Sequence, residues 1–170
     1  DDQEYAKWYN CDAMRNHSGS TEVSRIMKNC GDAVGMDWGC DASSASISKV
    51  APAFRNNFHY SSTSDKDFNY STVESEIKSR RPVILSGGSK GQKDCFLGIF
   101  CWDTYENGHA WVCDGYKKNT LTTPTYTYSY KYLHMNWGWG AWNDWYSFND
   151  WSVSNRSYNY KKRMIYNIRP

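Results

Sequence analysis

The chain has 170 residues and a near-balanced charge, with 20 basic and 18 acidic side chains and a formal net charge of +2 at pH 7. This balance excludes the strongly basic surface of a nucleic-acid binder. The chain also contains no run of about 20 apolar residues, the length that a helix needs to span a membrane. The length predicts a single domain over residues 1–170. The charge balance fits a small or protein substrate better than a polyanion, and we expect a protein or peptide. Aromatic residues make up 17% of the chain, a content that suits exposed clefts and cores with polar-topped side chains alike.

Three segments in the first half of the chain have the apolar spacing of helices. Residues 20–30 place Val23, Ile26, Met27 and Cys30 on one face, and Gly31 is expected to end that helix. Residues 43–58 predict a second helix if Pro52 lies in its early turns, because proline is tolerated there. Residues 71–82 carry acidic side chains early and basic ones late, the order that a helix dipole favours.

From Pro82 onward the sequence changes to short β-rich runs separated by turn residues. The predicted strands are residues 82–86, 108–116, 130–138, 144–148 and 163–168. Residues 88–106 predict either a hairpin or an ordered loop at the rim of a site, and residues 120–130 a hairpin tip or a surface strand. Helices followed by strands indicate an α+β fold.

Six cysteines are dispersed at spacings that match neither a zinc site nor a redox CxxC motif. This even, scattered set favours disulfides, with Cys95 and Cys101 the best pair because they flank a short segment. Cys113 is expected in the core or in a bridge. The sequence predicts no metal site and no cofactor.

His109 and Asn136 could carry chemistry together. His109 opens the strand at 108–116, where a neutral imidazole can take a proton from a nucleophile and return it to a leaving group. Asn136 ends the next predicted strand, so its amide oxygen could accept the imidazole N–H while Trp137 shields that bond from water. Each residue alone is uninformative, but the combination is the placement that a cysteine-histidine-asparagine protease requires.

The motifs GHAWVCDGY, HMNWGWG and WYSF resemble the His and Asn-Trp motifs of the streptopain family of secreted bacterial cysteine proteases. EVSRIMKNCGDAVGMDWG, SSAS and AFRNNFHY are similar to the stretch that precedes the family's histidine, and MIYNIRP is similar to its closing strand. The resemblance covers residues 8–170 in family order. It identifies the chain as the C-terminal portion of the family's catalytic domain, with the nucleophile-bearing N-terminal part absent.

The resemblance implies a papain-like fold, in which helices come first and an antiparallel, barrel-like β half carries the catalytic His and Asn. It also implies a secreted, cell-surface or periplasmic endopeptidase that is made as a zymogen and prefers a hydrophobic residue two before the cut. His109 becomes the general base and acid, Asn136 its orienting partner and Trp137 the shield. Residues implied to line the substrate site are Ser43, Ser44, Ala45 and Gly108.

No segment of the chain matches the family's nucleophile motif, so the resemblance implies a catalytic cysteine on an upstream segment or a separate chain. Cys11 is the best candidate within the chain, although the residues after it break the helix that should carry a nucleophile. The alternative function is a catalytically inactive homologue that acts as a secreted module binding peptides or glycans through its aromatic surface.

Overall fold

The structure is a computed structural model that describes residues 21–40, 43–96, 100–139 and 142–170. It divides into two compact units, one of Asp1–Ser64 with Ile168–Pro170 and the other of Asp65–Asn167. The single domain over residues 1–170 stays a prediction. Among the described helices, none combines the length and the apolar character that a membrane crossing needs.

The first unit contains helix α2 (Thr21–Ala33), the 3-10 turn η2 (Ile47–Lys49) and helix α3 (Val50–Asn56). Helix α2 continues through Gly31, which was expected to end it. A Cβ atom at residue 31 would lie 2.2 Å from Cζ2 of Trp38, so a larger residue there would displace the indole that packs against the helix. On the predicted apolar face Val23 and Ile26 are half-buried, whereas Met27 is 66% exposed. The predicted helix is therefore present, and its predicted end was wrong.

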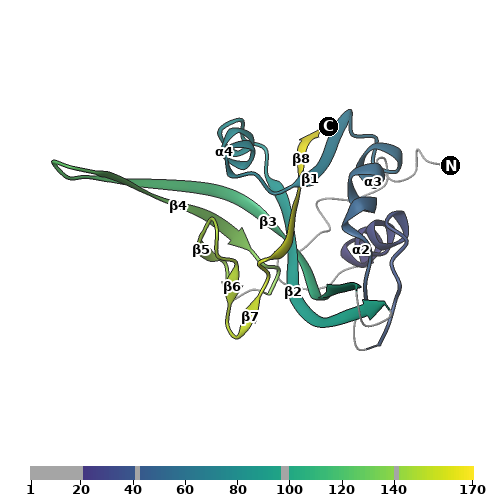
Figure 1. The fold of residues 1–170 in the computed structure, drawn as a ribbon. Helices are drawn as coiled ribbons and strands as arrows, with labels where there is room; N and C mark the ends of the chain where they lie inside the picture. The colour runs from purple at the N-terminus through teal and green to yellow at the C-terminus, as the bar shows by residue number, and fades with distance from the viewer. Residues whose placement is uncertain (1–20, 41–42, 97–99, 140–141) are drawn as a thin grey trace. The chain divides into compact units, whose positions relative to one another are not determined.

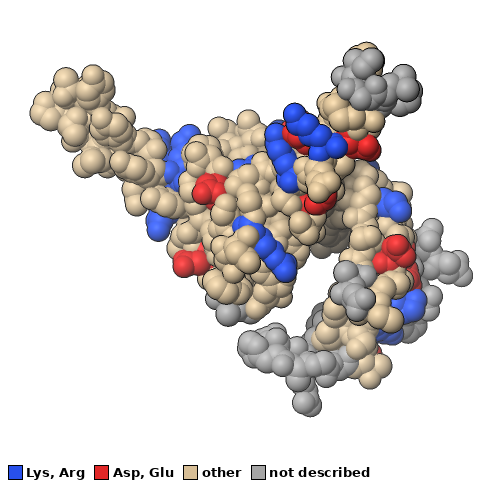
Figure 2. All heavy atoms as spheres, turned by 60° about the horizontal axis from the view of Figure 1, so that its bottom comes forward, with Lys and Arg blue, Asp and Glu red and all other residues tan. Residues whose placement is uncertain are grey.

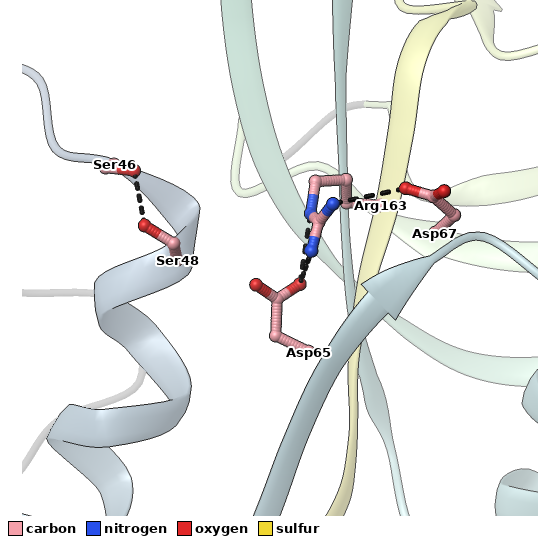
Figure 3. Close-up of polar contacts among 5 residues, drawn as sticks. All are labelled: Ser46, Ser48, Asp65, Asp67 and Arg163. Atoms are coloured by element: carbon pink, nitrogen blue, oxygen red, sulfur yellow. Dashed lines mark hydrogen bonds and ion pairs between the residues drawn. The ribbon is translucent and has the colours of Figure 1, made fainter.

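Helix α3 confirms that Pro52 lies in the first helical turn, where its missing N–H costs no hydrogen bond. Ala51 and Ala53 are buried, and the Ala51 carbonyl accepts a hydrogen bond of 2.7 Å from the hydroxyl of Thr63. Arg55 donates to the carbonyl of the same threonine at 2.6 Å. Just before the helix the hydroxyls of Ser46 and Ser48 are 2.8 Å apart (Figure 3).

The main sheet has the strand order β1-β8-β2-β3-β4-β5 within the described residues (Figure 1). The strands are β1 (Ser62–Asp67), β2 (Val83–Phe96), β3 (Phe100–Thr122), β4 (Thr127–Asn136), β5 (Asp144–Ser147) and β8 (Tyr160–Arg169). The pairs β2–β3, β2–β8, β3–β4 and β4–β5 are antiparallel. Strands β6 (Ser152–Val153) and β7 (Arg156–Ser157) form a separate small hairpin.

Strands β2 and β3 extend well beyond their predicted lengths. The sequence left residues 88–106 open between a hairpin and a loop. Their described parts, residues 88–96 and 100–106, are paired antiparallel strands of β2 and β3, with register shifts near Gly88 and Gly91. A disulfide joins Cys95 to Cys101 directly opposite it, which confirms the predicted bridge. Strand β1 was not predicted, because its sequence STSDKD has no apolar alternation.

The core of the second unit lies between the sheet and the elements that cover one of its faces. Fully buried side chains on its central strands include Val83, Leu85, Cys113, Leu133, Met135 and Met164. On β2 and β4 they alternate along the strand, the period of a half-buried sheet. Trp137 and Trp151, which lie outside the strands, complete this core.

Helix α4 (Tyr70–Lys78) packs on this core through Val73. The side chain of Asn69 caps the helix by accepting the Thr72 N–H at 3.0 Å. At its other end, buried Glu76 accepts two hydrogen bonds from Arg81 and one from the backbone N–H of Asn167 in β8. This carboxylate therefore links the helix to a strand far away in the sequence.

Strand β1 is linked to β8 by a charged cluster within the second unit. The guanidinium of Arg163 lies between Asp65 and Asp67, donating to the first carboxylate at 2.7 Å and to the second at 3.1 Å (Figure 3). These ion pairs hold edge strand β1 against β8, a contact that the sequence pattern of β1 did not predict.

Candidate active site

His109 lies on β3 directly opposite Gly87 of β2. It shares a face with Trp111 and Cys113, because alternate residues of a strand point to the same side. Both of these residues are buried, whereas His109 itself is only partly buried. The imidazole therefore lies where the core reaches the surface, as expected for a histidine at the mouth of a strand.

An aromatic cluster of Trp111, Trp137, Trp139 and Tyr158 surrounds the imidazole. Trp139 stacks on it with centroids 4.4 Å apart and an interplanar angle of 20°. Trp137 lies nearly parallel at 6.2 Å and 12°, and Tyr158 is tilted at 5.8 Å. These rings hold the imidazole in one plane and exclude water from much of its surface.

The hydrogen bond of His109 fixes its tautomer. Nε2 lies 2.9 Å from the backbone carbonyl oxygen of Trp137. A carbonyl oxygen can only accept, so Nε2 carries the proton and donates it. In neutral His109 the lone pair is then on Nδ1, and this nitrogen is the one that can act as a base.

Burial lowers the pKa of His109 below its ordinary value of 6.5, because the aromatic surroundings disfavour the charged imidazolium. The bond to the Trp137 carbonyl opposes this effect and raises the pKa, while the positive charge of Arg156 lowers it further. The net effect is a lowered pKa, which favours the neutral imidazole at neutral pH, and this is the form that accepts a proton.

Asn136 lies at the end of β4, opposite Val112. Residues that face each other across an antiparallel pair share one face of the sheet, so Asn136 lies on the face of Val112, opposite that of His109. Its side-chain oxygen accepts the backbone N–H of Gly138 at 3.1 Å. In this structure the imidazole N–H is thus held by the Trp137 carbonyl, whereas the sequence led us to expect the Asn136 amide as its acceptor.

Trp137 follows Asn136 directly and is 1% exposed. The turn that Asn136 closes onto Gly138 contains Trp137, so the asparagine holds the residue whose carbonyl orients His109. The indole lies nearly parallel to the imidazole at 6.2 Å, and its predicted role as a shield of a His109–Asn136 bond stays a prediction. The structure therefore brings His109 and Trp137 into contact and links Asn136 to them through the backbone.

Gly108 precedes His109 on β3 and lies under the ring of Tyr105. A Cβ atom at residue 108 would be 2.7 Å from that ring, and one at Gly88 would be 2.6 Å from it. The two glycines therefore let Tyr105 lie flat over the backbone next to His109. Tyr105 was not among the predicted site residues, and its ring is 43% exposed on the side of the strand to which residue 108 points.

The predicted cleft residues Ser43, Ser44 and Ala45 belong to the first unit and are exposed. Ser44 pairs with Asp37 through two backbone hydrogen bonds, and the Ser43 hydroxyl accepts the N–H of Gly39 at 3.3 Å. These bonds fix a short turn after Trp38. The role of the three residues in substrate binding stays a prediction.

The cysteines of the second unit offer no reactive thiol to His109. Cys95 and Cys101 are joined, and Cys113 is fully buried, with burial raising its pKa to about 12. Such a thiol stays protonated at neutral pH and is a poor nucleophile. Cys30 and Cys40 are exposed in the first unit, and Cys11 lies outside the described residues.

The sequence did not identify Trp139 and Tyr158 as site residues, although both contact His109. Trp139 belongs to the same Trp-Gly-Trp run as Trp137, and that repetition was the available signal. Tyr158 lies in the segment between β7 and β8 and gave no such signal, because its approach to His109 depends on the path of that loop. Over the described residues no group of three or more His, Cys, Asp or Glu side chains could hold a metal ion.

Comparison with known proteins gives a family and a fold for this chain. The family model described as the peptidase C10 family matches residues 2–146, and no curated protein sequence matches. Among solved structures the chain is similar to a fragment of prointerpain A from Prevotella intermedia, a cysteine-to-alanine mutant, at 21% identity with a TM-score of 0.58. The match covers 95% of this chain and 48% of the prointerpain A chain, so this chain spans about half of the length of that protein fragment. The chain belongs to the peptidase C10 family, the streptopain family of proteases.

Proposed function

We propose that this chain is the histidine-bearing part of a streptopain-like cysteine endopeptidase with a papain-like fold. The observation that carries the proposal is the geometry of His109, whose Nε2–H is fixed by the Trp137 carbonyl and whose Nδ1 is left as a base. Family membership supports a peptidase, and the lowered pKa of His109 suits a group that must accept a proton near neutral pH.

The nucleophile in this proposal is a cysteine on an upstream segment or on a separate N-terminal chain. Burial raises the pKa of Cys113, and Cys95 and Cys101 are joined in a disulfide, so none of these three cysteines supplies a thiolate. The chain spans only about half of the protease structure it matches, which leaves room for such a segment.

The proposed reaction begins with transfer of the thiol proton to Nδ1 of His109. The thiolate attacks the carbonyl carbon of the scissile peptide bond, and the C–N bond breaks as the imidazolium gives its proton to the leaving amine. His109 then takes a proton from water, whose oxygen attacks the carbonyl carbon of the thioester. The C–S bond breaks, the carboxylic acid is released, and the imidazolium returns the proton to the thiolate. Trp137 and Trp139 would keep the imidazole in its plane throughout both steps.

The remaining features of the proposal concern the substrate and its setting. Ser43, Ser44 and Ala45 would line the cleft, Gly108 would offer backbone beside the scissile bond, and a hydrophobic residue two before the cut would be preferred. We propose that the enzyme is secreted or held at the cell surface or in the periplasm, and that it is made as a zymogen. The exposed ring of Tyr105 beside Gly108 adds an apolar contact for the peptide.

The test uses the full-length protein that contains this chain, treated with a peptidyl epoxide that alkylates activated thiols. Mass spectrometry should find the label on a cysteine outside the described residues, and the protein should cleave an unfolded protein substrate. In the variant His109→Ala the labelling rate should fall by about 100-fold or more, the contribution of a positioned base.

The matched control is His134→Ala. His134 lies on β4 and pairs with Asp114, outside the aromatic cluster, so labelling should be unchanged. Absence of both labelling and cleavage in the full-length protein, or labelling of Cys30 or Cys40, would defeat the proposal. Peptide binding without cleavage would instead favour an inactive homologue.

A further inference from the structure

The outer parts of β3 and β4 form a two-stranded arm, residues 114–130. β3 pairs with β2 only as far as Cys113, and β4 pairs with β5 only from Tyr132. Within the described residues both long edges of the arm are therefore unpaired. Figure 1 shows this ribbon running out from the other strands of the second unit. An isolated two-stranded ribbon is marginally stable in water, so an arm of this length calls for a partner.

The arm carries no charge over residues 119–130. Lysines occur only toward its base, at Lys117 and Lys118, and at Lys131 just beyond it, and Figure 2 shows an uncharged projection with blue side chains near its base. Proteins normally protect exposed strand edges with charges, prolines or bulges. Between Asn119 and Thr123 and between Thr125 and Tyr130 that protection is missing, and only Pro124 interrupts the run at the tip.

The two faces of the arm differ in chemistry. Tyr126, Tyr128 and Tyr130 lie on one face and are 65%, 48% and 50% exposed, with Leu121 beside Tyr128 at 54%. The opposite face consists of hydroxyl residues, namely Thr120, Thr122, Thr127 and Ser129. Exposed tyrosines at every second residue are suited to cross-strand aromatic pairs with another strand.

The hydrogen-bonding edge of β4 can be assigned from its base. The Lys131 carbonyl accepts the N–H of Phe148 at 3.1 Å, so Lys131 directs its carbonyl to the β5 side. Alternate residues of a strand point to the same edge. Ser129 and Thr127 therefore present their N–H and C=O groups on that side, beyond the end of β5, where no described strand takes them.

We propose that two copies of this chain associate by antiparallel pairing of their β4 edges about a two-fold axis at Tyr128. Ser129 then lies opposite the partner's Thr127, and their outward N–H and C=O groups exchange hydrogen bonds. Tyr128 meets the partner's Tyr128 in a non-hydrogen-bonded pair, and Tyr130 meets the partner's Tyr126. The proposal is independent of peptidase activity.

The charge of the edge favours a second copy as the occupant. Two identical strands carry identical charges, and the edge over residues 125–130 carries none, so two copies of it pair without like-charge repulsion. In the register centred on Tyr128, Lys131 lies opposite the partner's Thr125, and no two lysines face each other. A register centred on Ser129 would need the Lys131 carbonyl that Phe148 already occupies.

The size of the contact sets its strength. Stable interfaces bury about 1,200–2,000 Å² in total, and the short edge from Thr125 to Lys131 provides less. We therefore expect a weak, concentration-dependent dimer with a dissociation constant above about 1 μM. Sedimentation equilibrium of the full-length protein over a concentration series measures it directly.

Two proline variants test which edge pairs. Ser129→Pro removes an N–H from the proposed edge, and proline is tolerated at such outward positions. Thr120→Pro is the matched control, because Thr120 is the cross-strand neighbour of Ser129 and directs its N–H to the other edge of the arm. We expect Ser129→Pro to weaken dimerisation at least about tenfold and Thr120→Pro to leave it unchanged.

Cysteine variants test the register. In a non-hydrogen-bonded pair the Cα atoms are about 4.5 Å apart, so Tyr128→Cys should form an intermolecular disulfide on oxidation. Tyr130→Cys is the control, because the two copies of residue 130 would lie about 14 Å apart and could not be bridged. Equal crosslinking of the two variants, a monomer at every concentration, or a dimer that survives Ser129→Pro would overturn the proposal.

Discussion

At the scale of single residues, the site depends on how His109 is held. A carbonyl acceptor at Nε2 and stacked rings on the imidazole fix both its orientation and its tautomer, and they do so without any charged partner. The resulting low pKa is a consequence of burial, so the same rings that position the base also keep it unprotonated.

The first prediction concerns the protonation of His109. Nitrogen-detected NMR should show a proton on Nε2 in the neutral form and a titration midpoint below 6.5. The folded state then binds fewer protons than the unfolded state as the pH falls through 6.5, so the stability contributed by neutral His109 is lost on acidification. Thermal unfolding of His109→Gln should show a weaker dependence on pH in this range than the unsubstituted protein. A midpoint above 6.5, or a proton on Nδ1, would contradict the assignment.

The second prediction separates Asn136 from His109. Asn136→Ala removes the acceptor for the Gly138 N–H and loosens the turn that presents the Trp137 carbonyl, so kcat should fall by about tenfold. His109→Ala removes the base itself, and kcat should fall by about 100-fold to 10,000-fold. Asn136→Asp keeps the acceptor and should retain most of the activity. Equal losses from the two alanine variants would show that the asparagine does more than position its neighbours.

At the scale of elements, local patterns predicted the helices and most strands but not their ends. The helix predicted at residues 20–30 extends through Gly31 to Ala33, because glycine permits a helical backbone as well as a helix end. Strand β1 escaped detection because its charged residues contribute ion pairs with Arg163 rather than an apolar stripe. For β1 a contact outside the local window decided the outcome.

The third prediction tests the link between α4 and β8. Glu76→Gln weakens the charged hydrogen bonds to Arg81 and alters the acceptor for the Asn167 N–H, so the free energy of unfolding should fall by about 1–3 kcal/mol. Glu74→Gln is the matched control on the same helix, where the carboxylate pairs with exposed Lys78. Its stability should be unchanged within the error of urea unfolding. Equal effects would show that the carboxylate at residue 76 has no special structural role.

At the scale of the whole molecule, the second unit is organised around the buried face of the central strands. Leu85 on β2 is fully buried between its neighbours Trp111 of β3 and Met164 of β8. The same face continues outward to His109, so the core that stabilises the sheet also supports the site.

The fourth prediction is that Leu85→Ala lowers the free energy of unfolding by about 2–5 kcal/mol, because it leaves a cavity among rigid neighbours. Leu121→Ala, at an exposed position on the arm, should change the stability by no more than about 0.5 kcal/mol. Urea unfolding followed by tryptophan fluorescence measures both. A small effect of Leu85→Ala would mean that the core relaxes around the missing side chain.

The sequence by itself determined the family, the α+β class, most of the helices and strands and the Cys95–Cys101 disulfide, because these depend on local patterns and motifs. It also singled out His109 and Trp137, whose catalytic roles stay predictions. Only the tertiary structure decided which oxygen accepts the imidazole N–H and that Trp139 and Tyr158 surround the ring. The physical reason is strand register: a displacement of one residue between β3 and β4 moves a side chain to the opposite face, and no local pattern fixes the register where bulges interrupt it.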